Sequence, residues 1–254
     1  MKTSRLSTSA LLSLAAWLLC AAAVLAQAPT ELPPRVVACS PEPFATNVDP
    51  DLQEIAITFD QPMNTETKSG FGYLRWAGVF PGVRDAEPTW DEGRTVCTLP
   101  VELEPDVTYA VAVNTSKQRN FTDQAGVAAL SFAWVFATGE RTPDDFPAHV
   151  VSSDPPLGAT DVDAHQREIS VTFSRPVAPG DFSWVILRGS GVYPGQRGGP
   201  SPTLSDDRLT ASLAVLLSPG TVYALSVNDV YYFGYKDTRG HPVLPFGWCF
   251  KTAD

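Results

Sequence analysis

Residues 54–63 read EIAITFDQPM, and residues 168–177 read EISVTFSRPV, so one pattern returns after 114 residues. Three further pairs of residues share this interval: Tyr109 and Tyr223, Trp134 and Trp248, and Thr138 and Thr252. A register kept over so much of the chain indicates one structural unit that is copied twice, end to end.

Each copy of this segment alternates large apolar residues with small or polar ones. Ile55, Ile57 and Phe59 stand at every second position, which predicts a β-strand with one buried face. Pro62 follows, where a residue without an N–H ends the hydrogen-bonded ladder. Each unit closes on three aromatic residues two apart, which we interpret as core: Phe132, Trp134 and Phe136, then Phe246, Trp248 and Phe250.

The remaining pattern predicts an all-β chain. The 23 prolines and 18 glycines are spread along the sequence as turn signals between short apolar runs, and no stretch after residue 26 keeps a helical period. We therefore expect two antiparallel β-sandwiches in series, over residues 35–139 and 148–254. A short polar linker at 140–147 joins them, and a proline-rich lead-in precedes them at 27–34.

Residues 1–26 have the layout of a secretory signal peptide. Lys2 and Arg5 precede an apolar run at 11–25, and Ala26 is a small residue at the expected cleavage point. The protein is therefore expected to be exported, to the periplasm, the cell surface or the medium, without a membrane span after cleavage. Lipidation at Cys20 is an alternative, although the bulky Leu19 disfavours it.

Charge limits the classes of partner. Removal of Lys2 and Arg5 from the 18 basic residues leaves 16 against 28 acidic residues, a net charge of −12. Nucleic acids and anionic membranes both require a basic face, so neither is expected as a partner.

Three cysteines follow the signal peptide. Cys39 and Cys97 can form a disulfide in an oxidising compartment or remain thiols, and sequence cannot supply the distance that decides between them. Their counterparts in the second unit are Ser153 and Ala211, so the unit folds without this bridge. Cys249 is interpreted as a small apolar side chain on a strand.

Motifs in both copies resemble a known family. The first copy has Ala45-Thr46-Asn47-Val48, Thr58-Phe59-Asp60-x-Pro62-Met63, Asp123-x-x-Gly126 and Trp134-x-Phe136-x-Thr138, and the second repeats this order. The pattern resembles the bacterial immunoglobulin-like domain of the SbsA type, in two tandem copies. The resemblance implies Ig-like or fibronectin-III-like β-sandwiches that act as spacers or interaction modules in exported proteins. It implies no shared catalytic residues.

The two copies differ most at the loop before the last strands. Residues 115–120 read TSKQRN, whereas residues 229–234 read DVYYFG. Aromatic side chains on a loop bring large contact area at little entropic cost, so we propose Tyr231, Tyr232, Phe233 and Tyr235 as candidate binding residues. Two alternatives stay open: a longer strand that packs these rings inward, or a seal against the first domain.

Enzymatic and metal-binding interpretations find little support. The histidines are His149, His165 and His241, and no nucleophile motif accompanies them. No phosphate-binding loop precedes a helix, and no cofactor or metal is expected. Three carboxylate pairs are the weak candidates for calcium, although none has the spacing of a calcium loop: Asp49 and Asp51, Asp144 and Asp145, and Asp161 and Asp163.

The sequence thus predicts a non-enzymatic binding or adhesion module at the bacterial cell envelope, whose partner is a polysaccharide or an envelope protein. One alternative is a structural spacer or assembly subunit of an envelope or S-layer complex. A small secreted hydrolase is a minor alternative, and it would need a pocket with convergent titratable groups.

Overall fold

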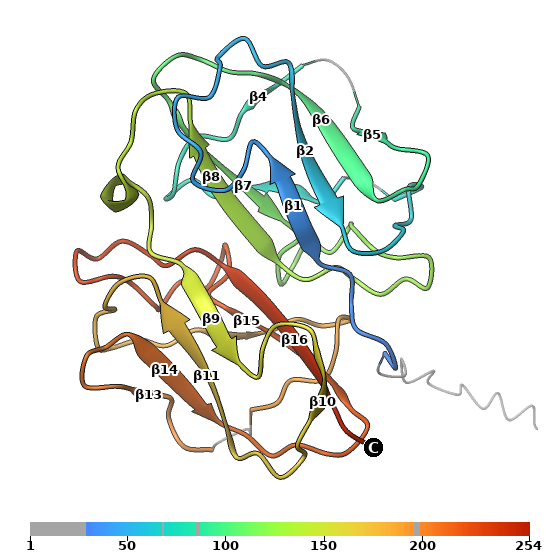
Figure 1. Cartoon of the computed structure of the whole chain (residues 1–254), viewed down its shortest axis with the longest axis vertical. Helices are drawn as coiled ribbons and strands as arrows, with labels where there is room; N and C mark the ends of the chain where they lie inside the picture. The colour runs from blue at the N-terminus through green and yellow to red at the C-terminus, as the bar shows by residue number, and fades with distance from the viewer. Residues whose placement is uncertain (1–28, 68, 85–86, 196–198) are drawn as a thin grey trace, which may run out of the picture.

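The computed structural model describes residues 29–67, 69–84, 87–195 and 199–254, so the expected signal peptide and Cys20 lie outside the described residues. The described chain consists of strands and one short 3-10 helix, η1 (Pro143–Asp145), which confirms the predicted all-β class. Two β-sandwich domains follow one another (Figure 1). No helix in the described ranges has the length and hydropathy needed to cross a membrane.

Domain 1 begins at β1 and ends at β8. Its outer sheet has the order β1-β2-β6-β4, with β5 also paired to β6, and β3, β7 and β8 form the opposite layer. The strand bounds are β1 Val36–Ser40, β2 Glu54–Phe59, β3 Phe71–Tyr73, β4 Gly82–Val83, β5 Thr89–Trp90, β6 Val96–Glu102, β7 Thr108–Val113 and β8 Phe132–Ala137.

Domain 2 repeats this plan. Its outer sheet has the order β13-β14-β11-β9, and β12, β15 and β16 form the opposite layer, with β10 paired to β16. The strand bounds are β9 Val150–Asp154, β10 Ala159–Val162, β11 Glu168–Phe173, β12 Trp184–Ile186, β13 Thr203–Leu204, β14 Thr210–Ala214, β15 Val222–Val227 and β16 Phe246–Thr252.

Each core forms where the repeated pattern predicts it. The two repeated strands, β2 and β11, share one alternation of buried and partly exposed residues. Trp134 and Trp248 have no exposed surface and pack in the separate cores of their domains, which confirms their interpretation as core residues. Burial of such large rings supplies much of the apolar area that holds a sandwich together.

A tyrosine fixes the same corner in each domain. The Tyr109 hydroxyl accepts a hydrogen bond from the Glu104 backbone N–H at 2.6 Å, and the Tyr223 hydroxyl accepts one from the Ser218 N–H at 2.7 Å. Both rings are buried, so each tyrosine ties the turn before its strand to the core.

The two domains share one sheet, which the sequence did not reveal. Strand β16 of domain 2 pairs antiparallel with β8 of domain 1, so hydrogen-bonded neighbours run β12-β15-β16-β8-β7-β3 across the junction. The paired residues at the crossing are Phe246 and Phe132, which are themselves equivalent positions of the repeat. Pairing of a residue with its own equivalent is the signature of twofold symmetry, so the domains pack like an isologous dimer within one chain.

Packing at the junction follows the same pseudo-symmetry. Leu244 of domain 2 packs against Leu74, Ala110 and Val135 of domain 1. In turn, the equivalent Leu130 of domain 1 packs against the equivalent residues of domain 2, which are Leu187, Ala224 and Cys249. Both leucines are buried.

Gly247 permits the close approach of the domains. Its N–H donates a hydrogen bond to the Ser131 carbonyl at 2.9 Å across the junction. A Cβ at position 247 would collide with that carbonyl oxygen, so only glycine fits here.

Candidate functional site

The aromatic loop of domain 2 is held at its base by Asn228. The Asn228 side-chain amide donates to the carbonyls of Tyr235 and Val243, both at 2.8 Å, and its oxygen accepts from the Tyr235 N–H at 3.0 Å. Asn228 is buried and has a left-handed backbone, with φ of 56°, which Asn tolerates better than most residues. Residues 229–234 therefore project from a fixed base.

Asp229 joins this loop to domain 1. Its carboxylate accepts hydrogen bonds from the Ser116 N–H at 2.8 Å, the Ser116 hydroxyl at 3.0 Å and the Tyr231 N–H at 3.0 Å. The Asp229 residue has no exposed surface. Three donors, two of them from the other domain, satisfy this buried charge and fix the loop against the junction.

The structure separates the four candidate aromatic residues into two groups. Tyr231, Tyr232 and Phe233 are 41%, 51% and 40% exposed, whereas Tyr235 has no exposed surface. Tyr235 packs against three rings of its own core: Phe173, Phe182 and Trp184. Burial also raises the pKa of its hydroxyl. Tyr235 is thus a core residue, and the signal for this was present in the repeat, since its equivalent is the buried Phe121.

The exposed rings also contact domain 1. The Lys117 ammonium lies 4.1 Å from the centroid of the Tyr231 ring and 5.8 Å from that of Tyr232. The Phe233 ring lies 6.4 Å from that of Trp76. The loop is therefore a partial seal between the domains, and half of the Tyr232 surface remains open to solvent.

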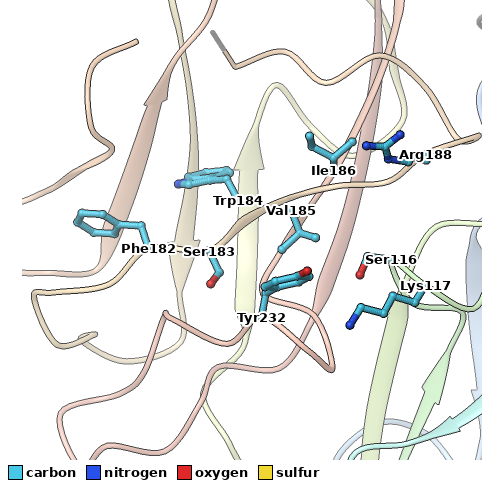
Figure 2. A pocket seen from close by; sticks show the side chains of 9 residues that line it. All are labelled: Ser116, Lys117, Phe182, Ser183, Trp184, Val185, Ile186, Arg188 and Tyr232. Atoms are coloured by element: carbon cyan, nitrogen blue, oxygen red, sulfur yellow. The ribbon is translucent and has the colours of Figure 1, made fainter. Parts of the chain in front are cut away.

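A groove of about 460 Å³ runs beside this loop (Figure 2). Ser116 and Lys117 of domain 1 line one side, and Tyr232 with residues 182–186 of domain 2, including the edge strand β12, lines the other. Arg188 completes the lining. Figure 2 shows Tyr232 and Lys117 on neighbouring walls, with Val185 next to the tyrosine ring. Neither domain alone supplies both walls.

Sequence reasoning missed the cations of this groove. Lys117 and Arg188 line it directly, and the Arg119 guanidinium donates to the Arg188 carbonyl from across the junction. A signal for Lys117 was present, because it is the repeat equivalent of Tyr231, and equivalent residues meet at a pseudo-twofold junction.

The disulfide that the sequence left open does not form. Cys39 and Cys97 are both free thiols. They pair with Ile57 from opposite sides, since β2 lies between β1 and β6. Two strand spacings separate their Cα atoms by roughly 9.6 Å, beyond the roughly 7 Å that a disulfide spans. Burial raises the pKa of each of these thiols to about 12 and that of Cys249 to about 11, which favours the protonated thiol over the reactive thiolate at neutral pH.

The carboxylates and histidines of the described residues do not gather into a metal site. In the described ranges, no three His, Cys, Asp or Glu side chains are grouped closely enough to hold a metal ion. His165 bonds the neighbouring Asp163 on the surface, and His241 lies 3.8 Å from Asp237. His149 packs on Phe44 across the domain junction, with ring centroids 4.4 Å apart.

A model of the bacterial Ig-like domain matches the chain twice, at residues 30–138 and 144–252. No curated protein sequence matches. Domains 1–6 of the surface-layer protein SbsC are 12% identical over 88% of this chain and 26% of theirs, with a TM-score of 0.29. The N-terminal part of the bacterial S-layer protein SbsC is also 12% identical, over 88% of this chain and 45% of its own length, with a TM-score of 0.30.

A tandem of titin domains, A168–A169, is 12% identical over 88% of this chain and all of its own, with a TM-score of 0.25. The chain thus spans less than half of the S-layer structures that it matches.

Proposed function

The chain belongs to the bacterial Ig-like domain family, with one such domain in each half, and on that premise we propose that it is an exported, non-enzymatic binding module of the bacterial cell envelope. The family is bacterial, and the sequence of residues 1–26 has a signal-peptide layout. The narrower assignment to the SbsA type is part of the same proposal and rests on the motifs that both halves repeat.

The ligand site in this proposal is the groove at the domain junction. One observation carries it: a half-exposed tyrosine, Tyr232, forms the wall of a concavity of about 460 Å³ whose other wall belongs to domain 1. This volume lies in the range of roughly 300–1,000 Å³ that small-molecule sites occupy. A flat, rigid ring with an exposed face can stack on a sugar ring, so a polysaccharide of the envelope is the proposed ligand.

The site is preorganised. Asn228 fixes the base of the loop, and the Asp229 carboxylate holds Ser116 of the facing wall. The shared sheet then sets the distance between the two walls. A groove that already has its bound shape loses little conformational entropy on binding, which raises its affinity for a given contact area.

Retention on isolated envelope polysaccharide tests this function. We expect Tyr232→Ser to reduce the retention of the full chain, because it removes the stacking surface, while the melting temperature stays the same. Tyr73→Ser is the matched control, since Tyr73 is 56% exposed on β3, away from the groove. Equal retention of the wild type and both variants would contradict the proposal.

The shared sheet favours a second candidate function, a structural spacer or assembly subunit of an envelope complex. Pairing of β8 with β16 joins the two domains through one sheet, a useful property in a spacer. In that case Tyr232→Ser would leave retention on polysaccharide unchanged. Cross-linking on intact source cells would then capture the same neighbouring envelope protein with the wild type and the variant.

A further inference from the structure

We infer that the interdomain groove takes a carboxylated sugar, such as a uronic acid residue in an acidic glycan. The sugar ring would stack on Tyr232, and carboxylates of the glycan would pair with the cations that line the groove, Arg188 and Lys117. This inference rests on the proposed function and specifies its ligand class.

The charge of the groove opposes that of the whole chain. The protein carries 28 acidic and 18 basic residues, yet Lys117 and Arg188 line the groove and Arg119 contacts Arg188. None of these three makes a salt bridge within the described part of the chain. Three unpaired cations beside one concavity favour an anionic ligand.

The nearby Asp229 carboxylate makes no salt bridge with these cations. Asp229 is fully buried beneath the loop, and its oxygens already accept three hydrogen bonds, from Ser116 and from the Tyr231 N–H. Lys117 is instead held over the Tyr231 ring at 4.1 Å, a cation–π contact that leaves ammonium N–H groups free to donate. Its charge is therefore positioned and available at the groove.

The pseudo-symmetry of the molecule supplies an internal comparison. The edge of domain 1 has Arg75 where domain 2 has Arg188, but Gln118 where domain 2 has Tyr232. Arg75 packs over the Tyr73 ring, with its guanidinium carbon 5.5 Å from the centroid. Of the two edges, the domain 2 edge therefore combines Arg188 with the ring of Tyr232 and with Lys117 of the other domain. The domain 1 edge has Gln118 in place of that ring. Recognition is therefore placed at the domain 2 edge.

Calorimetric titration of the full chain tests the ligand class. The probes are tetragalacturonate and its carboxyl-reduced neutral counterpart. We expect the acidic probe to bind about tenfold or more tightly than the neutral one, the effect of one charge-assisted hydrogen bond or more. Arg188→Gln should weaken binding of the acidic probe about tenfold more than it weakens binding of the neutral one. The matched control, Arg75→Gln, should change neither.

The outcomes separate the two proposals. Equal affinity for both probes, with loss of both in Tyr232→Ser, would overturn the carboxylate assignment and leave the groove as a neutral sugar site. Tighter binding of a phosphorylated tetrasaccharide than of tetragalacturonate would also overturn it. No binding of any probe, together with unchanged envelope retention in Tyr232→Ser, would refute the proposed function itself.

Discussion

Leu244 offers a sharp test of the domain junction, because its side chain belongs to domain 2 but packs in a cluster of domain 1. It is 3% exposed and belongs to one buried cluster with Leu74, Ala110 and Val135. Leu244→Ala removes this contact without a change of charge or backbone. Its effect on stability therefore measures how much the junction contributes to the folded state.

The expected loss follows from the burial of the side chain. The substitution removes three carbons, which at roughly 0.8 kcal/mol each contribute about 2.4 kcal/mol of transfer free energy. The cavity that remains adds about 1 kcal/mol, since the surrounding sheet relaxes only in part. We therefore expect the free energy of unfolding to fall by about 3 kcal/mol.

Urea unfolding of the full chain, followed by tryptophan fluorescence, measures this loss. Leu216→Ala is the matched control, because Leu216 is 60% exposed in the same domain and its truncation should change stability by less than about 0.5 kcal/mol. If Leu244→Ala also costs less than about 1 kcal/mol, the side chain is not buried between the domains and the described junction is wrong.

Three other predictions concern single groups. Tyr109→Phe leaves the Glu104 N–H without its acceptor, so we expect a loss of about 1–2 kcal/mol in urea unfolding; no loss would contradict the tyrosine corner. Burial lowers the pKa of His149, which packs on Phe44. The folded state therefore favours the neutral imidazole, and the free energy of unfolding should fall as the pH drops below about 6.5. This fall should be smaller in His149→Phe than in the wild type. An equal fall in the two proteins would exclude His149 as the cause. An aromatic disulfide reagent at pH 8 should find no fast thiol in the folded chain from residue 27 onward. After unfolding in guanidinium it should find three, Cys39, Cys97 and Cys249, whereas a Cys39–Cys97 bridge would leave only Cys249.

The repeated segment predicts most of the fold because its signals are local. Alternation at Ile55, Ile57 and Phe59 specifies a strand with one buried face, and the structure places that strand at β2. The interval of 114 residues then transfers each assignment to the second unit. Trp134 and Trp248 are buried for the same reason, because both lie within an alternating aromatic strand.

The junction was not predicted, because contacts between repeats leave no periodic signal in either unit. A local signal did exist: β7 reads TYAVAV and β8 reads FAWVFA, nearly continuous apolar runs. Continuous runs indicate strands that are covered on both faces, and the second cover here is the other domain. The sequences of β7 and β8 thus indicate that the face of their sheet turned away from the domain 1 core is also buried.

The candidate site was predicted only in part, because the contacts between the two domains that complete it leave no periodic signal in the sequence. Tyr231, Tyr232 and Phe233 were identified from their difference between the two copies, but the groove that Tyr232 lines needs Lys117 from the other domain. A residue that acts across a junction can be found only when the junction is known. The difference between copies also included Tyr235, whose aromatic equivalent Phe121 marks it as core.

The amide hydrogen exchange rate of Gly247 tests the shared sheet most directly. Its N–H donates to the Ser131 carbonyl of the other domain and has no partner there unless the domains are docked. We predict protection close to that of amides within the β15–β16 ladder. Exchange as fast as that of an exposed loop amide, with β15 and β16 still protected, would show that the domains are separate and that the groove does not form.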